Sequence, residues 1–294
     1  REPRSRRVRG AASASRAMTG WLRSPLLERH GFAHAFTTRQ GGVSAAPFDS
    51  LNLARNVGDD PEAVAENHRR LADALGYARL FELSQVHGRV VREIGAHEAP
   101  EDVRREEGDA LVAREAGVAV AVRVADCIPL LLADPTTGAV AAVHAGWRGV
   151  EARIAEAALA TLAGPSSRRG HPPTDPSSRR GHPPTDPSRV LAAIGPHIRL
   201  GHFEVGPEVA DRLEAVAHGV ACSDRSMEKP HVDLTAILRA QLRALGVVHV
   251  DDVGGCTYAE RTRFFSFRRD GSASGRQVGV IVAREARAAI GGAT

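Results

Sequence analysis

Three residues in the middle of the chain have side chains of the types that can bind metal ions. Cys127 lies between two apolar segments, His144 ends a third, and His87 stands before a glycine. One thiolate and two imidazoles suit Zn²⁺, and three protein ligands leave a fourth position for water or substrate, as in catalytic zinc sites. The spacings of 40 and 17 residues match no zinc-finger signature. A buried cysteine beside two hydrogen-bonded histidines is therefore the alternative that the spacing leaves open.

The apolar patterns around these residues predict the elements that must position them. Asp60 followed by Pro61 is typical of a helix start, and Gly76 closes the apolar repeat of that helix. Further helices are expected after Gly149 and over 207–217 and 234–245. Strands are expected over 80–86, 90–94, 110–112, 118–124, 128–133, 140–144, 190–194, 249–253, 264–268 and 278–283.

The connections between these segments indicate the fold class. Several strands are joined by connections too short for a crossover helix, so the sheets should be mixed or antiparallel and layered with helices. Neither GxGxxG nor GxxxxGK[ST] occurs, so the common phosphate-binding loops are absent from the sequence. We expect an α/β protein, an α+β sandwich, and not a doubly wound dinucleotide fold.

Two segments lack the apolar periodicity of a packed domain. Residues 1–17 hold six arginines and one glutamate, and Met18 follows them. We interpret 1–18 as a disordered basic arm, a transit-like peptide or, preferably, a misannotated segment upstream of the natural start. The sequence PSSRRGHPPTD occurs twice in tandem over 165–186, which predicts a flexible insertion at 165–187. Residues 19–290 are expected to form a single domain.

The charge and composition exclude several classes of protein. The formal net charge is +4, but residues 1–17 contribute +5, so the remainder is slightly acidic and argues against nucleic acid binding. No apolar run reaches the ~18 residues that cross a bilayer, so we expect no membrane span. Three cysteines are too few for a disulfide scaffold. We therefore expect a cytoplasmic protein.

Several segments resemble the laccase-domain family, also called YfiH-type. They include LSQVHG (83–88), GDALV (108–112), VADCIPLLLADP (124–135), AAVHAGWRGV (141–150) and FFSFRRDG (264–271). Members of that family are variously labelled multicopper polyphenol oxidase-like protein, peptidoglycan-editing factor and purine nucleoside phosphorylase. The resemblance implies a single α/β sandwich similar to the cytotoxic necrotising factor deamidase. It also implies that His87, Cys127 and His144 bind zinc.

A copper polyphenol oxidase is the least favoured of the activities that these labels suggest. Such an enzyme needs a set of histidines, usually as HxH pairs, and a His₂Cys site with a weak axial methionine. The 13 histidines contain no HxH pair, and the only methionines are Met18 and Met227. Zinc is therefore preferred to copper as the cofactor.

Further residues near these motifs are candidates for catalysis and substrate binding. Cys127 and His144 are the candidate catalytic pair, and Asp126 is a candidate acid/base or an acceptor that orients a metal-binding histidine. Gln85 either contacts the base of a substrate or finishes a strand. Trp147 either stacks on a purine ring or packs in the core.

Phosphate binding requires fixed cations, and the guanidinium group pairs with two oxygens at once. Arginines in glycine-rich surroundings suit this role. The candidates are Arg39, Arg148 and either Arg268 or Arg269, and the alternative for each is an ordinary surface salt bridge.

The resemblance implies purine nucleosides and inorganic phosphate as substrates. We expect zinc-dependent phosphorolysis of adenosine, inosine, guanosine or methylthioadenosine, together with adenosine deamination. The first alternative is a Cys/His amide hydrolase or peptidoglycan-editing factor, and the second is a non-catalytic, metal-stabilised interaction module. The residue pattern carries no information on the oligomeric state.

Overall fold

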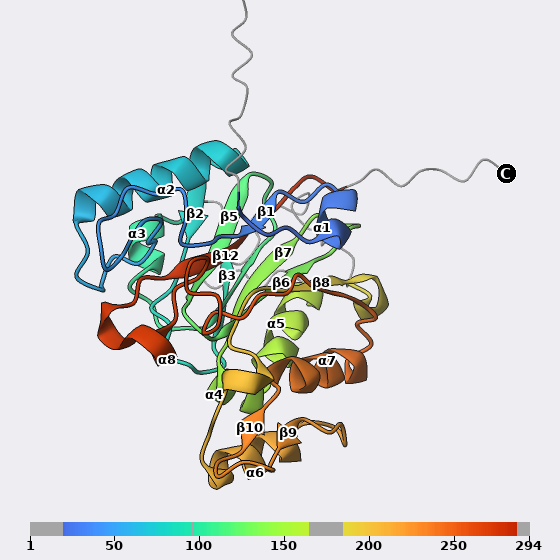
Figure 1. Ribbon diagram of the computed structural model, residues 1–294. Coiled ribbons are helices and arrows are strands. Elements are labelled where there is room, and N and C mark those ends of the chain that lie inside the picture. Colours follow the sequence, from blue (N-terminus) through green and yellow to red (C-terminus); the bar gives the residue numbers. More distant parts are fainter. Residues whose placement is uncertain (1–19, 96, 165–184, 287–294) are drawn as a thin grey trace, which may run out of the picture.

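The computed structural model of the protein describes residues 20–95, 97–164 and 185–286 (Figure 1). The predicted arm at 1–18 lies outside these residues, as does the tandem repeat up to residue 184. The single domain over 19–290 stays a prediction. None of the helices described is long and apolar enough to cross a membrane.

The described elements alternate between strands and helices along the chain. The helices are α1 (Pro25–Arg29), α2 (Pro61–Leu75), α3 (Pro100–Val103), α4 (Trp147–Glu151), α5 (Ile154–Ala163), α6 (Pro207–Ala215), α7 (Leu234–Ala244) and α8 (Phe267–Asp270). The strands are β1 (His34–Phe36), β2 (Arg79–Phe81), β3 (Val91–Ile94), β4 (Ala110–Ala113), β5 (Val118–Val124), β6 (Ile128–Ala133), β7 (Val140–Ala145), β8 (Leu191–Ile194), β9 (Ser223–Asp224), β10 (His231–Val232), β11 (His249–Asp252) and β12 (Gln277–Val282).

The strands form two large sheets and one small one. The order is β1-β12-β5-β2 in the four-stranded sheet and β11-β8-β6-β7-β4-β3 in the six-stranded sheet, while β9 pairs with β10. The pairs β2/β5, β3/β4 and β8/β11 are parallel, and the neighbouring pairs are antiparallel. The predicted α/β class with mixed sheets is therefore confirmed.

Successive side chains of a strand point to opposite faces of its sheet, and the clusters that they join show how the elements are layered. On β5, Val120 faces a core cluster shared by the two large sheets, whereas Ala121 faces a cluster that includes residues of α2. On β6, Leu131 points into the core between the sheets and Leu130 points toward α4, α5, α6 and α7. The layers therefore run from α2 through the two sheets to the helices around α5 and α7 (Figure 1).

The helix predicted after Asp60 is confirmed at both ends. The Asp60 carboxylate accepts a hydrogen bond from the Glu62 backbone at 3.0 Å, Pro61 is the first helical residue, and Gly76 adopts the left-handed conformation with φ of 72°. The strand predicted over 80–86 is shorter than expected, since β2 ends at Phe81.

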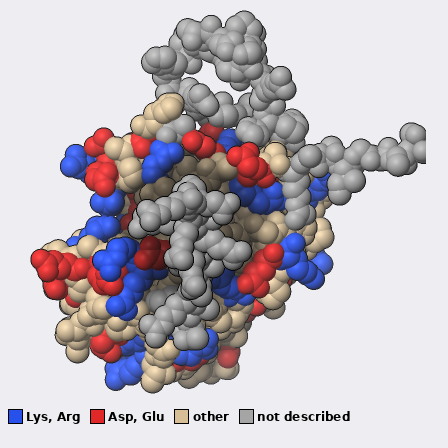
Figure 2. Space-filling model, turned by 90° about the horizontal axis from the view of Figure 1, so that it is seen from above, with Lys and Arg blue, Asp and Glu red and all other residues tan. Residues whose placement is uncertain are grey.

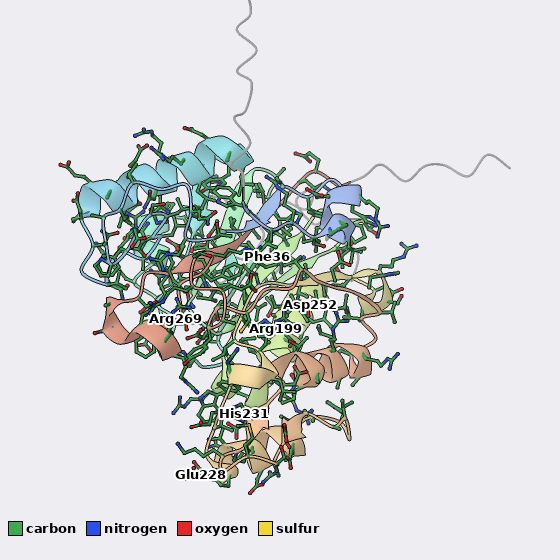
Figure 3. The ribbon with its side chains drawn as sticks, viewed as in Figure 1. Phe36, Arg199, Glu228, His231, Asp252 and Arg269 are labelled. Carbon is green, nitrogen blue, oxygen red and sulfur yellow. The ribbon has the colours of Figure 1, made fainter. Side chains whose placement is uncertain are left out.

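The strand predicted over 264–268 is wrong, because Phe267 begins the helical turn α8. Ser266 caps this turn by accepting a hydrogen bond from the Arg269 backbone at 3.2 Å. The Arg269 guanidinium, labelled in Figure 3, donates to the carbonyl oxygens of Thr257, Tyr258 and Phe264. Tertiary hydrogen bonds thus override the β propensity of the phenylalanines.

Candidate metal centre

The structure brings together the three residues that the sequence singles out as metal ligands. Ligand atoms of His87, Cys127 and His144 all lie within 4.8 Å of one another, and the Cys127 Sγ is 3.8 Å from the His87 Nε2. Among the residues described, this is the only group of three or more histidine, cysteine or acidic side chains with such a geometry. The donor set of one sulfur and two nitrogens fits zinc.

Strand ends and turns place these side chains. His144 is a buried residue of β7, and Cys127 immediately precedes β6, which pairs with β7 in antiparallel register. His87 lies in the connection between β2 and β3 and has a φ of 61°, a conformation that L-residues adopt rarely. Its ring meets that of His144 edge to face, with 4.7 Å between the centroids.

The buried carboxylate of Asp109 holds both histidines, and the sequence reasoning missed this residue. Its Oδ1 accepts from the His144 Nδ1 at 2.8 Å and from the His87 backbone at 2.9 Å, and its Oδ2 accepts from the Gly88 backbone at 2.6 Å. Because the Nδ1 of His144 is occupied, its Nε2 is left for a metal or for Cys127. The GDALV motif contained the only sequence signal for Asp109.

The electrostatics of the cluster favour a thiolate beside an imidazolium when no cation is bound. Burial opposes the charged form of each group, but the positive charge of His144 and hydrogen bonds from both histidines lower the pKa of Cys127 to about 6. Against the same desolvation, Cys127 and Asp109 raise the pKa of His144 to about 9. Burial also opposes the charged form of Asp109, but hydrogen bonds from His144 and from the Gly88 and His87 backbones, together with the charge of His144, lower its pKa.

The backbone beside the ligands leaves space that only glycine allows. A Cβ on Gly146 would lie 3.0 Å from the Cys127 Sγ and 3.0 Å from the His87 Cδ2. The absence of a side chain at Gly146 therefore leaves the space next to Cys127 and His87 unfilled, which fits a metal ion held by three ligands.

Asp126 and Gln85 lie close to the ligands in sequence but bind other partners. The Asp126 carboxylate accepts from the Thr257 hydroxyl at 2.7 Å and from the Arg268 backbone at 2.6 Å. The carboxylate that orients His144 is thus that of Asp109, not that of Asp126. Gln85 exchanges two 2.8 Å hydrogen bonds with the backbone of Arg123, so its amide is bound to β5.

The candidate phosphate ligands occupy different surroundings. The Arg39 guanidinium is held by Asp49 at 2.9 Å and by backbone carbonyls of the same region. Arg148 is exposed, stacks on Trp147 at 4.3 Å, and forms no salt bridge with any residue in the described ranges. The Arg268 guanidinium donates to the Glu204 carbonyl at 2.9 Å and lies over the Phe203 ring.

Arg276 is a cation close enough to Cys127 of the candidate metal centre to interact with its charge, and the sequence reasoning did not select it as a site residue. It is partly buried just before β12, and desolvation lowers its pKa although the charges of Asp126 and Cys127 oppose this shift. Its guanidinium donates to the carbonyls of Ser274 and Gly275 and lies over the Phe267 ring.

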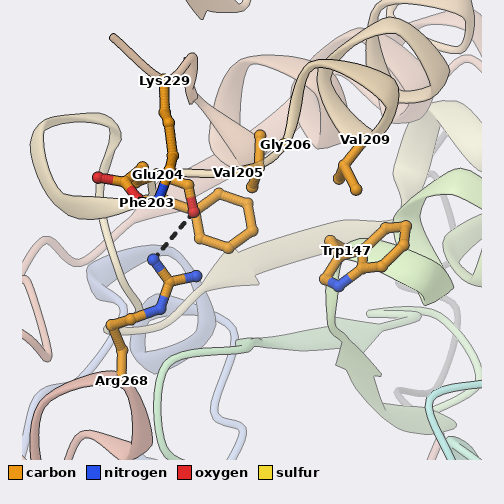
Figure 4. A pocket seen from close by; sticks show the side chains of 8 residues that line it. All are labelled: Trp147, Phe203, Glu204, Val205, Gly206, Val209, Lys229 and Arg268. Carbon is orange, nitrogen blue, oxygen red and sulfur yellow. Dashed lines mark hydrogen bonds and ion pairs between the residues drawn. The ribbon is translucent and has the colours of Figure 1, made fainter. Parts of the chain in front are cut away.

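A cavity of about 570 Å³ adjoins the segments that carry the ligands. Trp147, three residues after His144, lines one side of it, and Phe203 and Arg268 line the other (Figure 4). Its volume and aromatic lining suit a small organic molecule.

The fold and the site together define a class: a layered α/β protein with a His-Cys-His candidate metal centre. Comparison with known families makes the assignment more specific. Residues 33–172 and 178–284 match the model of the family described as multi-copper polyphenol oxidoreductase laccase, and the chain belongs to that family.

Known proteins similar to this chain include one enzyme and two solved structures. A purine nucleoside phosphorylase from Deinococcus radiodurans is 40% identical over 261 residues, which cover 87% of this chain and 92% of the relative. YlmD from Geobacillus stearothermophilus has a TM-score of 0.77 and 32% identity, with 90% of this chain and 97% of that chain covered. NMB0706 from Neisseria meningitidis has a TM-score of 0.70 and 35% identity, with 85% and 93% covered.

Proposed function

We propose that this protein is a zinc-dependent purine nucleoside phosphorylase that also deaminates adenosine. Its substrates would be adenosine, inosine, guanosine or methylthioadenosine, with inorganic phosphate as the co-substrate. The observation that carries the proposal is the cavity lined by Trp147, Phe203 and Arg268, of which Trp147 follows the candidate ligand His144 by three residues. The name of the Deinococcus radiodurans relative supports the same activity.

The cavity offers a surface for a purine and cations for a phosphate. The Trp147 indole and the Phe203 ring provide faces on which a purine can stack. Arg148 and Arg268 lie at these two aromatic residues, and their guanidinium groups can each pair with two phosphate oxygens. The backbone N–H of Arg268 is fixed on Asp126, beside Cys127, so this arginine is tied to the candidate centre.

Phosphorolysis and deamination make different demands on these groups. In phosphorolysis, a phosphate oxygen forms a bond to C1′ of the ribose, the bond from C1′ to the purine nitrogen breaks, and the base leaves with a proton. The products are a ribose 1-phosphate and the free base. In deamination, water adds at C6 of adenosine and ammonia leaves, which yields inosine. Arginine cations serve the first reaction, and a proton-transferring group near the base serves the second.

The chain's own residues would position a metal and the substrates. Zinc, when held by His87, Cys127 and His144, supplies Lewis-acid polarisation of a substrate or water oxygen. Asp109 keeps the His144 ring in one tautomer and orientation, and Gly146 keeps the neighbouring space open. The described residues contain one group of three candidate ligands and no further group from which a multinuclear copper cluster could be built, which favours zinc over a copper oxidase.

The proposal is tested by metal analysis combined with an assay of base release. Purified protein should hold one zinc per chain and release adenine or hypoxanthine from adenosine or inosine only when phosphate is present. Cys127→Ser should lose both zinc and turnover. Arg148→Ala should raise the KM for phosphate about tenfold and leave the KM for inosine nearly unchanged. Protein without stoichiometric zinc and without phosphate-dependent release would refute the proposal.

One observation favours a second candidate, a Cys/His amide hydrolase. Asp109, His144 and Cys127 follow one another as a carboxylate, an imidazole and a thiol, which is the order of groups in a cysteine nucleophile activated by a histidine. A thiol alkylating reagent distinguishes the two candidates. Protein from which a chelator has removed the metal is assayed before and after alkylation of Cys127. If it is active before alkylation and inactive afterwards, the thiol is the nucleophile and zinc is dispensable.

A further inference from the structure

Asp126 is a buried acidic residue in the turn between β5 and β6, and its backbone is strained. Its φ is 97°, in the left-handed region that residues other than glycine adopt rarely, and the residue is 9% exposed. The next residue, Cys127, is a candidate metal ligand. Strained backbone angles persist only where the surrounding structure fixes them, and they are frequent at functional sites. The contacts that fix Asp126 therefore also determine where the Cys127 side chain lies.

Three segments that are distant in the sequence hold Asp126 in this conformation. Its backbone carbonyl accepts a hydrogen bond from the Ile198 N–H at 3.0 Å. Its carboxylate accepts from the Thr257 hydroxyl at 2.7 Å and from the Arg268 backbone N–H at 2.6 Å. Thr257 in turn donates its own N–H to the His197 carbonyl at 3.1 Å, so these contacts form one connected network. The position of residue 126 is thus set by three other parts of the fold.

The bond to Arg268 joins this turn to the cavity beside Trp147. Arg268 is the second residue of α8, and its guanidinium donates to the Glu204 carbonyl and lies over the Phe203 ring in the cavity wall (Figure 4). Asp126 is therefore linked to a candidate metal ligand by one peptide bond and to a cavity cation by one hydrogen bond. A shift of its carboxylate would move these two groups relative to each other.

The surroundings of the Asp126 carboxylate favour a structural link over proton transfer to a substrate. Its Oδ1 is bound by the Thr257 hydroxyl and its Oδ2 by the Arg268 backbone, so each oxygen has a fixed donor within the protein. A general acid or base has to come within hydrogen-bond distance of the substrate atom that it serves. A buried carboxylate with both oxygens bound in this way suits the fixing of two elements.

We propose that Asp126 is a positioning residue that fixes the Cys127 side chain and α8 relative to each other, so that the metal and Arg268 act on one substrate. It acts through these two residues and does not itself contact the substrate. Its effect through Cys127 depends only on the candidate metal centre, whereas its effect through Arg268 rests on the proposed function.

Two substitutions separate the role of the carboxylate from that of the backbone. Asp126→Gly adopts the positive φ without strain but removes both side-chain hydrogen bonds. Asp126→Asn keeps them, because its amide oxygen can accept from the Arg268 N–H and its amide nitrogen can donate to the Thr257 hydroxyl, which also accepts.

The effect on the metal centre is measured with zinc and with cobalt. Asp126→Gly should weaken zinc binding about tenfold or more in competition with a chromogenic chelator. It should also change the visible absorption spectrum of the cobalt-substituted protein, which reports the geometry of the metal ligands. Asp126→Asn should match the wild type in both measurements.

Asp134→Gly is the matched control, because Asp134 lies just beyond the other end of β6 and has a similar set of partners. It is 2% exposed and accepts from the Thr185 hydroxyl at 2.6 Å and from the Thr136 backbone at 2.8 Å. Thermal unfolding should show that both glycine variants are destabilised, whereas zinc affinity and the cobalt spectrum should change only in Asp126→Gly. Wild-type zinc affinity in Asp126→Gly would overturn the proposal, and so would an equal loss of affinity in Asp134→Gly or in Asp126→Asn.

Phosphate-dependent base release at saturating zinc tests the link to Arg268. Asp126→Gly should raise the KM for phosphate about tenfold, because the backbone of Arg268 is no longer held, and Asp134→Gly should keep the wild-type KM. An unchanged KM for phosphate in Asp126→Gly would overturn this part of the proposal. If the wild type releases no base, the proposed function is refuted, and the zinc and cobalt measurements still decide whether Asp126 positions Cys127.

Discussion

At the scale of single residues, Asp109 organises the candidate centre. Its carboxylate accepts hydrogen bonds from the His144 ring and from the backbones of His87 and Gly88. The last two bonds hold His87 at its positive φ, which would otherwise be unfavourable. One buried side chain therefore fixes the orientation of one ligand ring and the backbone of another.

Replacing Asp109 with asparagine should weaken zinc binding about 10–100-fold, because a neutral amide orients His144 less well and gives the ring less basicity. Competition with a chromogenic chelator measures the zinc affinity. Asp102→Asn, which changes an exposed carboxylate on α3, is the control and should leave the affinity unchanged. Wild-type affinity in Asp109→Asn would mean that Asp109 does not position the ligands.

At the scale of elements, the turn from β7 into α4 decides how closely the ligands can approach. Gly146 caps α4 with ordinary extended backbone angles, so a side chain at this position meets no backbone strain. Its only obstacle is contact with Cys127 and His87, each 3.0 Å from an added Cβ. The glycine is required by the site and not by the turn.

Gly146→Ala should therefore lower zinc affinity at least tenfold, because the added methyl group pushes the two ligands apart. Gly201→Ala is the matched control, since a Cβ there meets nothing within 4 Å and its φ is not positive. Chelator competition and thermal unfolding are measured on both variants. Equal zinc affinity in the two variants would contradict the steric argument.

The α2 helix gives a second prediction at this scale. Asp60→Ala removes the acceptor for the Glu62 backbone N–H and should lower the free energy of unfolding by about 1 kcal/mol. Urea unfolding measures the change. Asp73→Ala, an exposed position in the same helix, should not destabilise the protein, and an equal loss there would remove the capping explanation.

At the scale of the whole molecule, charge is dispersed over the face that Figure 2 shows. Figure 2 shows basic and acidic side chains intermixed over the visible face, without a continuous basic stripe among the coloured residues. This pattern agrees with the slightly acidic net charge of the chain beyond residue 17. The coloured part of this face therefore presents no continuous basic footprint of the kind that a nucleic acid backbone requires.

One buried histidine makes the stability of the folded molecule depend on pH. The His197 ring lies between the Gly195 carbonyl, 2.9 Å from Nδ1, and the Thr235 hydroxyl, 2.7 Å from Nε2. Burial, aided by the charge of Arg199, lowers its pKa to about 4. The unfolded chain takes up this proton below pH 6.5, whereas the folded protein does not until about pH 4.

The stability from His197 is thus fully present above pH 6.5 and is lost as the pH falls toward 4, by up to about 3 kcal/mol. His197→Asn, which cannot titrate, should show a correspondingly smaller loss between pH 7 and pH 4.5 in urea unfolding. His97→Asn, at an exposed position, should behave as the wild type. Parallel pH profiles for wild type and His197→Asn would disprove the assignment.

Much of this protein follows from local patterns in its sequence. The Asp60-Pro61 start of α2, its end at Gly76 and the buried strands β5 and β6 are predicted because capping and apolar periodicity act over a few residues. The resemblance to a known family also singled out His87, Cys127 and His144. Their side chains belong to short motifs that are readable without the fold.

Other features were decided only by the tertiary structure. Asp109 binds His144 from 35 residues away, and Asp126, although adjacent to Cys127, binds Thr257 and Arg268 instead. The turn at Phe267 is helical because Ser266 caps it and Arg269 binds distant carbonyls. Hydrogen-bond partners and charges across a buried space depend on how layers pack, and no local pattern encodes that packing. The candidate metal ligands can thus be identified from the sequence, whereas the groups that orient them are determined only by the packing of the layers.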